Sequence, residues 1–179
     1  MKIMGILNVT PDSFSDGGRY VDVDKAVEHA VKMVQDGADI VDVGGESTRP
    51  GSTPISKEEE LARVIPVIQR LVSVVDVVIS IDTYKADVAR EAHRAGATMI
   101  NDVGAGGRDA EMFRVMAEAN VPVVLMHNLP HNQEKGSFYN IIREVSVKLQ
   151  SLVDLALSAG VKSEHIILDP GIGFGKTRE

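Results

Sequence analysis

The sequence predicts an α/β fold and, within that class, a (β/α)8 barrel of which only about six βα units are present. First, short segments rich in Val and Ile alternate with longer amphipathic segments along the whole chain, which is typical of a parallel sheet covered by helices. Second, a polar residue stands at the carboxyl end of each apolar segment. Third, no Gly-x-Gly-x-x-Gly follows the first segment, which disfavours a dinucleotide-binding sheet.

The apolar segments are predicted to be strands because Val and Ile dominate them, as expected of strands buried on both faces. Each segment is about 5–7 residues long, a normal strand length. The predicted strands are Ile3–Asn8, Ile40–Gly44, Val77–Asp82, Thr98–Asp102, Val121–His127 and His165–Asp169.

The intervening segments repeat apolar residues at helical spacing. They predict helices near residues 23–36, 56–73, 84–95, 108–119 and 137–159. Side chains that can accept a hydrogen bond at a helix start predict N-caps at Asp24, Ser56 and Asp109, with Glu59 completing a capping box after Ser56. Glycines where the helices should end are Gly37, Gly96 and Gly160.

Polar residues at the strand ends favour a barrel over an open doubly wound sheet. A barrel brings all its strand ends to one site, whereas an open sheet brings together only those near its switch point. The residues are Asn8, Asp42, Glu46, Asp82, Asn101, Asp102, His127, Asn128 and Asp169. A full barrel has eight βα units and typically about 250 residues. We therefore expect residues 1–179 to form a single domain that lacks the last two units, with two unpaired edges and exposed apolar inner faces.

Composition excludes several functional classes. The chain has no cysteine, so disulfides, thiolate catalysis and cysteine-based metal sites are excluded, and Mg²⁺ becomes the leading candidate for a metal. A formal net charge of -7 with 19 scattered basic residues argues against a nucleic-acid partner. No apolar run is long enough to cross a membrane and no signal peptide is visible, which predicts a cytoplasmic protein without a membrane partner.

Two loops are candidates either for a functional site or for simple turns. The first, Leu7–Gly18 (LNVTPDSFSDGG), is long and polar, and such a loop is functional, disordered or a series of turns. The second, Gly44–Gly51 (GGESTRPG), offers consecutive backbone N–H groups beside two hydroxyls and Arg49, which suits an oxyanion or a phosphate. The alternative for the second loop is a Gly/Pro-rich turn with a solvated Arg.

Three later strand ends suit a neutral heterocycle with several N–H donors. Asp82 lies in SIDTYK, Asn101 in INDV and Asp169 in ILDPGIGFGKT. Carboxylates only accept hydrogen bonds, whereas an amide both donates and accepts. A single Asp at a strand end is more often a helix cap or a turn former, but three such residues among the six strand ends favour a ligand site.

Other patterns are weaker. The GKT sequence is not a Walker A motif, because Pro170 occupies the position of the motif's first glycine. His127 and His131 are four residues apart, but Pro130 between them disfavours a helical zinc pair. The segment Gly104–Arg108 (GAGGR) predicts a turn.

The strings LNVTPDSFSDGG, GGESTRPG, SIDTYK, INDV and LDPGIGFGKT, in this order and each after a strand, resemble the bacterial dihydropteroate synthases over essentially the whole chain. The resemblance implies a pterin-binding TIM barrel. It also implies a transferase that joins 6-hydroxymethyl-7,8-dihydropterin diphosphate to 4-aminobenzoate, through a cationic pterin, to give 7,8-dihydropteroate and diphosphate. It implies Mg²⁺ as cofactor, these small molecules as partners, and a homodimer as a possible assembly.

The resemblance also implies roles for individual residues. The implied catalytic residues are Asp82, Asp16, Arg49 and Phe14. The implied substrate-binding residues are Thr48, Pro50, Asp82, Asn101, Met126, Asp169, Gly173 and Phe174, and the implied metal ligand is Asn8. For Met126 the alternative is ordinary strand core.

The chain departs from this family at its end, because a Lys-Ser-Arg segment after the seventh strand and an Arg-x-His segment on the eighth are both missing. We therefore expect weak or no synthase activity from this chain alone. Two alternatives remain. One is a non-catalytic pterin-binding fragment, and the other is a barrel of the methyltetrahydrofolate-binding methyltransferase type, which shares the Asp/Asn/Asp cradle but lacks the first-loop sequence.

Overall fold

The computed structural model describes residues 1–10, 22–47, 53–104, 106–128 and 138–174. Six strands form one sheet in the order β1-β2-β3-β4-β5-β6, and every neighbouring pair is parallel. The strands are β1 (Met4–Asn8), β2 (Ile40–Gly44), β3 (Val78–Asp82), β4 (Met99–Asp102), β5 (Val123–Met126) and β6 (Ile166–Asp169). Because the spatial order follows the sequence order without a reversal, the sheet is of the barrel type and not doubly wound.

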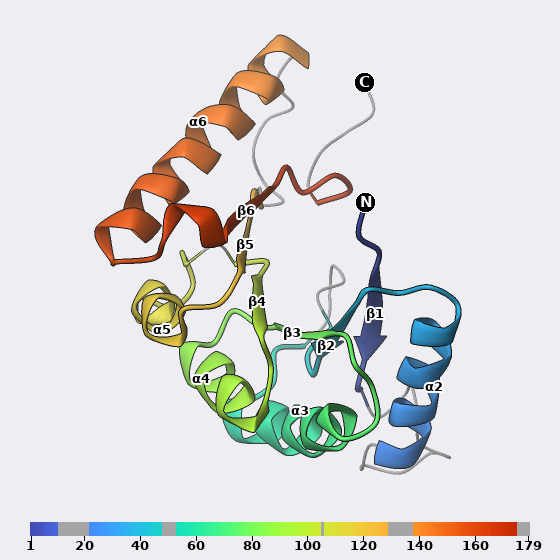
Figure 1. Cartoon of the computed structure of the whole chain (residues 1–179). Coiled ribbons are helices and arrows are strands. Elements are labelled where there is room, and N and C mark those ends of the chain that lie inside the picture. Colours follow the sequence, from blue (N-terminus) through green and yellow to red (C-terminus); the bar gives the residue numbers. More distant parts are fainter. Residues whose placement is uncertain (11–21, 48–52, 105, 129–137, 175–179) are drawn as a thin grey trace.

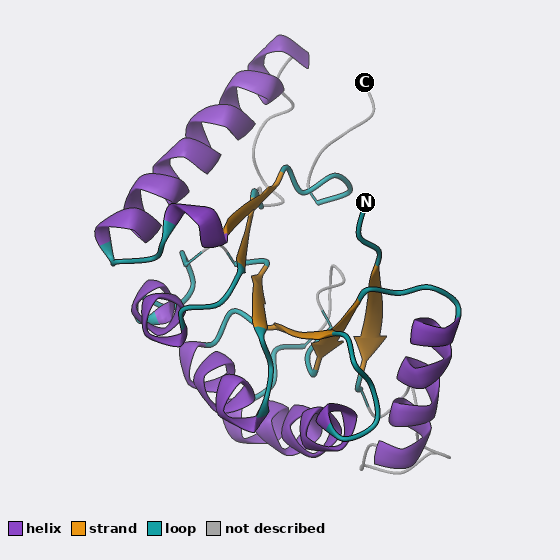
Figure 2. Ribbon diagram, viewed as in Figure 1, coloured by secondary structure: helices purple, strands orange, loops and turns teal. Residues whose placement is uncertain are grey.

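Helices connect the strands and lie on the outside of the curved sheet (Figures 1 and 2). They are α2 (Val23–Gln35), α3 (Lys57–Val72), α4 (Ala86–Ala95), α5 (Met112–Ala119) and α6 (Phe138–Ser158), with a short 3-10 helix at Ser163–His165. All six predicted strands and all five predicted helices are confirmed, with ends that differ by up to four residues. In the described ranges, no helix is both long enough and apolar enough to cross a membrane.

The predicted N-cap at Ser56 is confirmed, although the carboxylate of Glu59 pairs with Arg63 at 2.5 Å, and one predicted N-cap is wrong by two residues. Ser56 accepts a hydrogen bond of 3.1 Å from the backbone N–H of Glu59. At α2 the N-cap is Asp22 and not Asp24, because Asp22 Oδ1 accepts from the N–H of Lys25 at 3.1 Å. Asp24 instead lies in the first turn, where its negative charge interacts favourably with the helix dipole.

The second wrong N-cap has a tertiary cause. Helix α5 begins at Met112, with Glu111 at the cap position and no side-chain cap. Asp109 bridges two elements: its Oδ1 accepts from the N–H of Glu111 at 3.0 Å, and its Oδ2 accepts from the N–H of Ala86 at 2.8 Å. Asp109 therefore caps the start of α4, the preceding helix.

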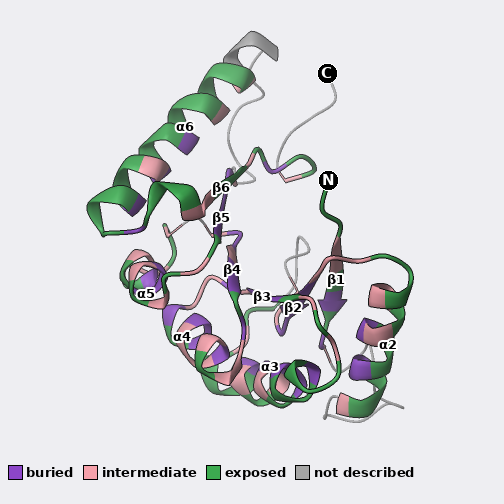
Figure 3. Ribbon diagram, viewed as in Figure 1, coloured by how far each residue is buried: buried purple, intermediate pink, exposed green. Residues whose placement is uncertain are grey.

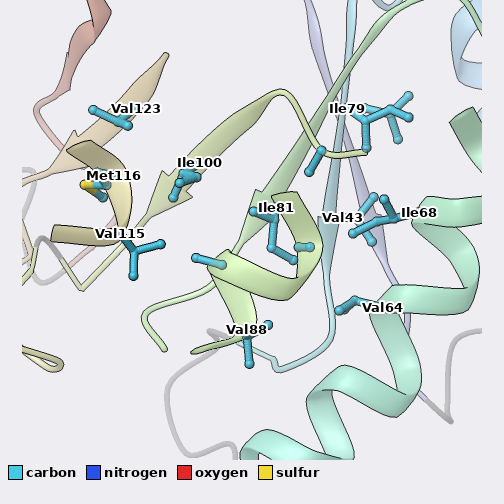
Figure 4. Packing of buried hydrophobic residues seen from close by; sticks show 14 of the residues in the cluster. Val43, Val64, Ile68, Ile79, Ile81, Val88, Ile100, Val115, Met116 and Val123 are labelled. Atoms are coloured by element: carbon cyan, nitrogen blue, oxygen red, sulfur yellow. The ribbon is translucent and has the colours of Figure 1, made fainter. Parts of the chain in front are cut away.

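The core lies between the outer face of the sheet and the helices (Figures 3 and 4). Full burial of one such aliphatic side chain stabilises a fold by about 1.5–3 kcal/mol, so this layer dominates the stability. Its labelled members in Figure 4 are Val43, Ile79, Ile81, Ile100 and Val123 from the strands, and Val64, Ile68, Val88, Val115 and Met116 from the helices.

The inner face of the sheet is left open at both ends. Strands β1 and β6 are the two edges of the sheet and lie at opposite ends of its arc (Figure 1). On these edges the inward-facing Ile6 is 63% exposed and Ile167 is 45% exposed. The expectation of two unpaired edges and exposed inner apolar residues is confirmed for the described residues.

We expect Gly96→Ala to destabilise the fold more than Gly37→Ala. Both glycines end a helix in the left-handed region, with φ of 117° and 108°, and this conformation costs an alanine about 1–2 kcal/mol. A Cβ at residue 96 would also lie 2.5 Å from Val72 Cγ2, whereas nothing lies within 4 Å of a Cβ at residue 37. Because Val72 is exposed, its side chain can turn to make room, which should add about 0.5–1.5 kcal/mol at residue 96 alone. Urea unfolding measures both variants, and equal losses would contradict this explanation.

Candidate functional site

A row of polar groups lies across the carboxyl ends of the first four strands. The parallel register aligns Asn8, Gly44, Asp82 and Asn101 as consecutive neighbours. Because side chains alternate between the two faces of a strand, all members of one row project to the same face. Here this is the inner face, opposite the helix-facing row that includes Val43 and Ile81.

The side chains of Asn8 and Asp82 come close to each other over Gly44. If residue 44 had a Cβ, it would lie 3.4 Å from Asp82 Oδ2 and 3.8 Å from Asn8 Oδ1, which are ordinary contact distances. A carboxylate oxygen and an amide oxygen thus face the same small space. The sequence prediction that Asn8, Asp82 and Asn101 come together is confirmed.

A second polar layer lies deeper, two residues before the first along the strands. Asp42 is 3% exposed and Ser80 is fully buried, and the two are register neighbours. Asp42 Oδ2 accepts a hydrogen bond of 2.8 Å from Nδ2 of Asn101. Within the described part of the chain, Asp42 Oδ1, Ser80 Oγ and Asp82 Oδ1 are buried without a hydrogen-bond partner. Such unsatisfied atoms are costly, which points to a site built for a ligand or for bound water.

Negative charge crowds this region. Burial, together with repulsion from Asp42, Glu60, Asp102 and Glu46, holds the pKa of Asp82 well above its ordinary value. Burial also raises the pKa of Asp42. A perturbed carboxyl in such a place is typical of a functional site. The arrangement favours a ligand that brings N–H donors or developing positive charge.

The β5–β6 side of the face supplies an apolar wall and a third carboxylate. Met126 is buried and is the register neighbour of Asp169. The Oδ1 atom of Asp169 accepts from the N–H of Gly171 at 2.7 Å, which fixes the half-buried carboxylate at the start of a turn. In the same turn the N–H of Phe174 donates to Gly171 O at 3.1 Å. Gly173 is exposed beside it.

An ionic cluster ties the base of the second loop to the scaffold. Lys85 Nζ donates to Glu46 Oε2 at 2.6 Å and also pairs with Glu60, whose side chain is 1% exposed. Glu46 further accepts from Tyr84 OH at 2.9 Å and from the N–H of Ile55 at 3.2 Å. Although burial acts to raise it, the hydrogen bonds from Lys85 and Tyr84 hold the pKa of Glu46 below its usual value.

No site role was predicted for Ser80, Glu60, Tyr84 and Lys85, and Asp42 was predicted only as one of the polar strand-end residues. Alternation along β2 and β3 places Asp42 and Ser80 on the inner face, and this was the available signal for them. No sequence signal pointed to Glu60, because it occupies an ordinary position in an amphipathic helix. The remaining predicted site residues lie outside the described residues: Phe14, Asp16, Thr48, Arg49 and Pro50. His131 and the GKT sequence also lie outside them.

Metal ligands are sparse in the part of the chain that the structure describes. No group of three or more His, Cys, Asp or Glu side chains in it is arranged to hold a metal ion. The oxygens of Asn8 and Asp82 that face the space over Gly44 are hard donors of the kind that Mg²⁺ prefers. Further ligands would have to come from a bound molecule or from water.

Comparison with known proteins defines the family. A family model described as pterin binding enzyme matches residues 4–179. The chain belongs to the pterin-binding enzymes.

Particular relatives are dihydropteroate synthases. The enzyme of Clostridium beijerinckii is 52% identical over 177 residues, which are 99% of this chain and 64% of that protein. The enzyme of Bacillus subtilis is 54% identical over 175 residues, 98% of this chain and 60% of that protein. This chain thus spans less than two thirds of the length of these relatives.

Solved structures agree with the sequence matches. Dihydropteroate synthase from Clostridium difficile, determined in the presence of pteroic acid, superposes with a TM-score of 0.92 at 50% identity over 99% of this chain and 66% of that chain. The enzyme from Xanthomonas albilineans with 4-aminobenzoic acid gives a TM-score of 0.89 at 46% identity over 98% of this chain and 63% of that chain. The predicted barrel class is confirmed.

We expect Asp82→Asn to raise the free energy of unfolding at neutral pH, because it removes a half-buried charge that neighbouring acids repel. A carboxyl whose pKa rises on folding contributes stability that is present below its unfolded pKa of about 3.9 and is lost as the pH rises through the folded value. The gain in the variant should therefore be small near about pH 4 and grow with pH. Chemical unfolding over a pH series measures this, and a gain independent of pH would contradict the assignment.

Proposed function

We propose that the protein acts as a dihydropteroate synthase, which joins 6-hydroxymethyl-7,8-dihydropterin diphosphate to 4-aminobenzoate in the cytoplasm. The observation that carries the proposal is the inner-face array of Asp82, Asn101 and Asp169 in a chain of the pterin-binding family. A pterin carries a 2-amino group and ring N–H groups along one edge, and carboxylate and amide oxygens accept such donors. Met126 supplies the apolar surface against which the flat ring packs.

The reaction that we propose breaks the bond from the pterin methylene to a diphosphate oxygen and forms a bond from the methylene to the arylamine nitrogen. The amine then loses a proton. Asp82 stabilises the positive charge that develops on the pterin as diphosphate leaves, because its carboxylate lies among other acids. No side chain need act as a nucleophile in this scheme.

The departing diphosphate requires positive charge and N–H donors. We assign this role to Arg49 and Thr48 of the second loop with their backbone N–H groups, and we assign Phe14, Asp16 and Pro50 to the aminobenzoate pocket. The ionic cluster of Lys85 ties Glu46 of the second loop to Ile55, which follows the loop, because Glu46 accepts from Lys85 and from the N–H of Ile55.

Magnesium fits the residues that are present. Mg²⁺ commonly binds one or two protein oxygens and completes its shell with phosphate oxygens and water. Asn8 Oδ1 and Asp82 Oδ2 face the same space over Gly44, so Asn8 would hold the ion and Asp82 would lie beside it. When bound, the ion would neutralise charge on the diphosphate.

A second candidate function is pterin binding without turnover. The open edges β1 and β6 and the exposed Ile6 and Ile167 favour it, because the inner face is not enclosed by the described residues. A reaction through a cationic pterin requires a site closed from water. A methyltetrahydrofolate-type methyltransferase is less well supported, since the sequence GGESTRPG suits a diphosphate.

We expect the chain to bind the pterin diphosphate in the presence of Mg²⁺ and Asp169→Asn to weaken this binding about tenfold or more, the loss typical of a charged hydrogen-bond partner. Isothermal titration calorimetry measures both. The matched control is Asp154→Asn, which changes an exposed carboxylate on α6 and should leave the affinity unchanged. No saturable binding to the wild-type chain, or equal binding to Asp169→Asn, would contradict the proposal.

Turnover separates the two candidate functions. We expect the 179-residue chain alone to form little dihydropteroate. A chimera that adds the part of the Bacillus subtilis enzyme outside the 60% that this chain matches should form at least tenfold more (about 1.4 kcal/mol), because added strands would cover the two sheet edges. Product formation by liquid chromatography is the measurement. Equal rates for the two proteins would show that the open edges do not limit catalysis.

A further inference from the structure

Asp42 is a buried carboxyl group that the proposed chemistry leaves without a role. It lies on β2 and its register neighbour on β3 is Ser80. Its hydrogen bond to Asn101 crosses β3, because Asn101 lies on β4. The residue is 3% exposed, and its second oxygen, Oδ1, has no hydrogen-bond partner among the described residues.

The bond to Asp42 fixes which way the Asn101 carboxamide is turned. The donor is Nδ2, at 2.8 Å from Asp42 Oδ2. Because Asp42 holds one of the two N–H groups of the amide nitrogen, the carboxamide has one orientation, in which its carbonyl oxygen and its second N–H group are left for a ligand. A carboxamide free to rotate would offer either a donor or an acceptor.

We propose that Asp42 is a positioning residue that holds the Asn101 carboxamide in one orientation at the floor of the site. With Asn101 oriented in this way, its carbonyl oxygen has a fixed place beside the carboxyl groups of Asp82 and Asp169. Such a set favours a heterocycle whose bound edge carries N–H donors opposite these acceptors, and it disfavours an analogue with a carbonyl at the same place, because two acceptors that face each other leave both unsatisfied.

This inference rests on the proposed function for the identity of its ligand, but the orientation of Asn101 can be measured without any ligand. The variant Asp42→Leu removes the acceptor at similar volume. The variant Asp42→Asn keeps a carbonyl oxygen that can still accept from Asn101, so it serves as the conservative rescue. The double variant Asp42→Leu/Asn101→Ala should have the same selectivity as Asn101→Ala alone, because Asp42 acts through Asn101.

The first measurement is NMR of the Asn101 side-chain amide, assigned by its absence in Asn101→Ala. We expect amide protons that exchange slowly with solvent in the wild-type chain and in Asp42→Asn, and fast exchange in Asp42→Leu. Unchanged exchange in a folded Asp42→Leu would overturn the proposal.

The second measurement is selectivity, by calorimetry with 6-hydroxymethylpterin and with the matching lumazine, in which a carbonyl replaces the 2-amino group. We expect the ratio of the two affinities to fall about tenfold in Asp42→Leu and to be retained in Asp42→Asn. An unchanged ratio in Asp42→Leu would overturn the proposal even if the amide signals change. If the wild-type chain binds neither compound, the proposed function fails, and the amide exchange still decides whether Asp42 orients Asn101.

Discussion

Parallel pairing in sequence order determines where the polar groups of the inner face lie. It brings the carboxyl ends of β1 to β6 to one edge of the sheet, so residues far apart in the chain become neighbours in register rows. The outer face is packed by aliphatic side chains against the helices, which fixes the rows rigidly. The inner face is thereby free to carry groups that a protein core would not otherwise hold.

The polar groups of the inner face lower the stability of the fold, and this loss of stability indicates that they serve a function. Asp42 is buried and Asp82 is half-buried near other acids, and each has an oxygen without a partner in the described ranges. Stability alone would favour apolar residues there. Their presence is consistent with a site whose missing hydrogen bonds come from a substrate, and it links the stability of the chain directly to its proposed chemistry.

Sequence patterns predicted the features that depend on local spacing. The strands follow from runs of Val and Ile, and the cap at Ser56 follows from a residue three positions away. Asp109 failed as a local cap because its carboxylate reaches the N–H of Ala86, which no spacing reveals. The same holds for the contact between Asp42 and Asn101, 59 residues apart, and for the pairing of Lys85 with Glu46. The positions of the strand ends thus predict which residues come together at one edge of the sheet. The hydrogen-bond partner of each residue can be identified only once the strand register is known.

If the inner-face acceptors of this chain bind the edge of a pterin ring, a crystal structure of the chain with 6-hydroxymethylpterin should show it. We expect ring N–H and amino groups within hydrogen-bond distance of Asp82, Asn101 and Asp169. A ring bound elsewhere, for example in the groove between α4 and α5 beside Arg90 and His93, would show that these acceptors do not form the pterin site.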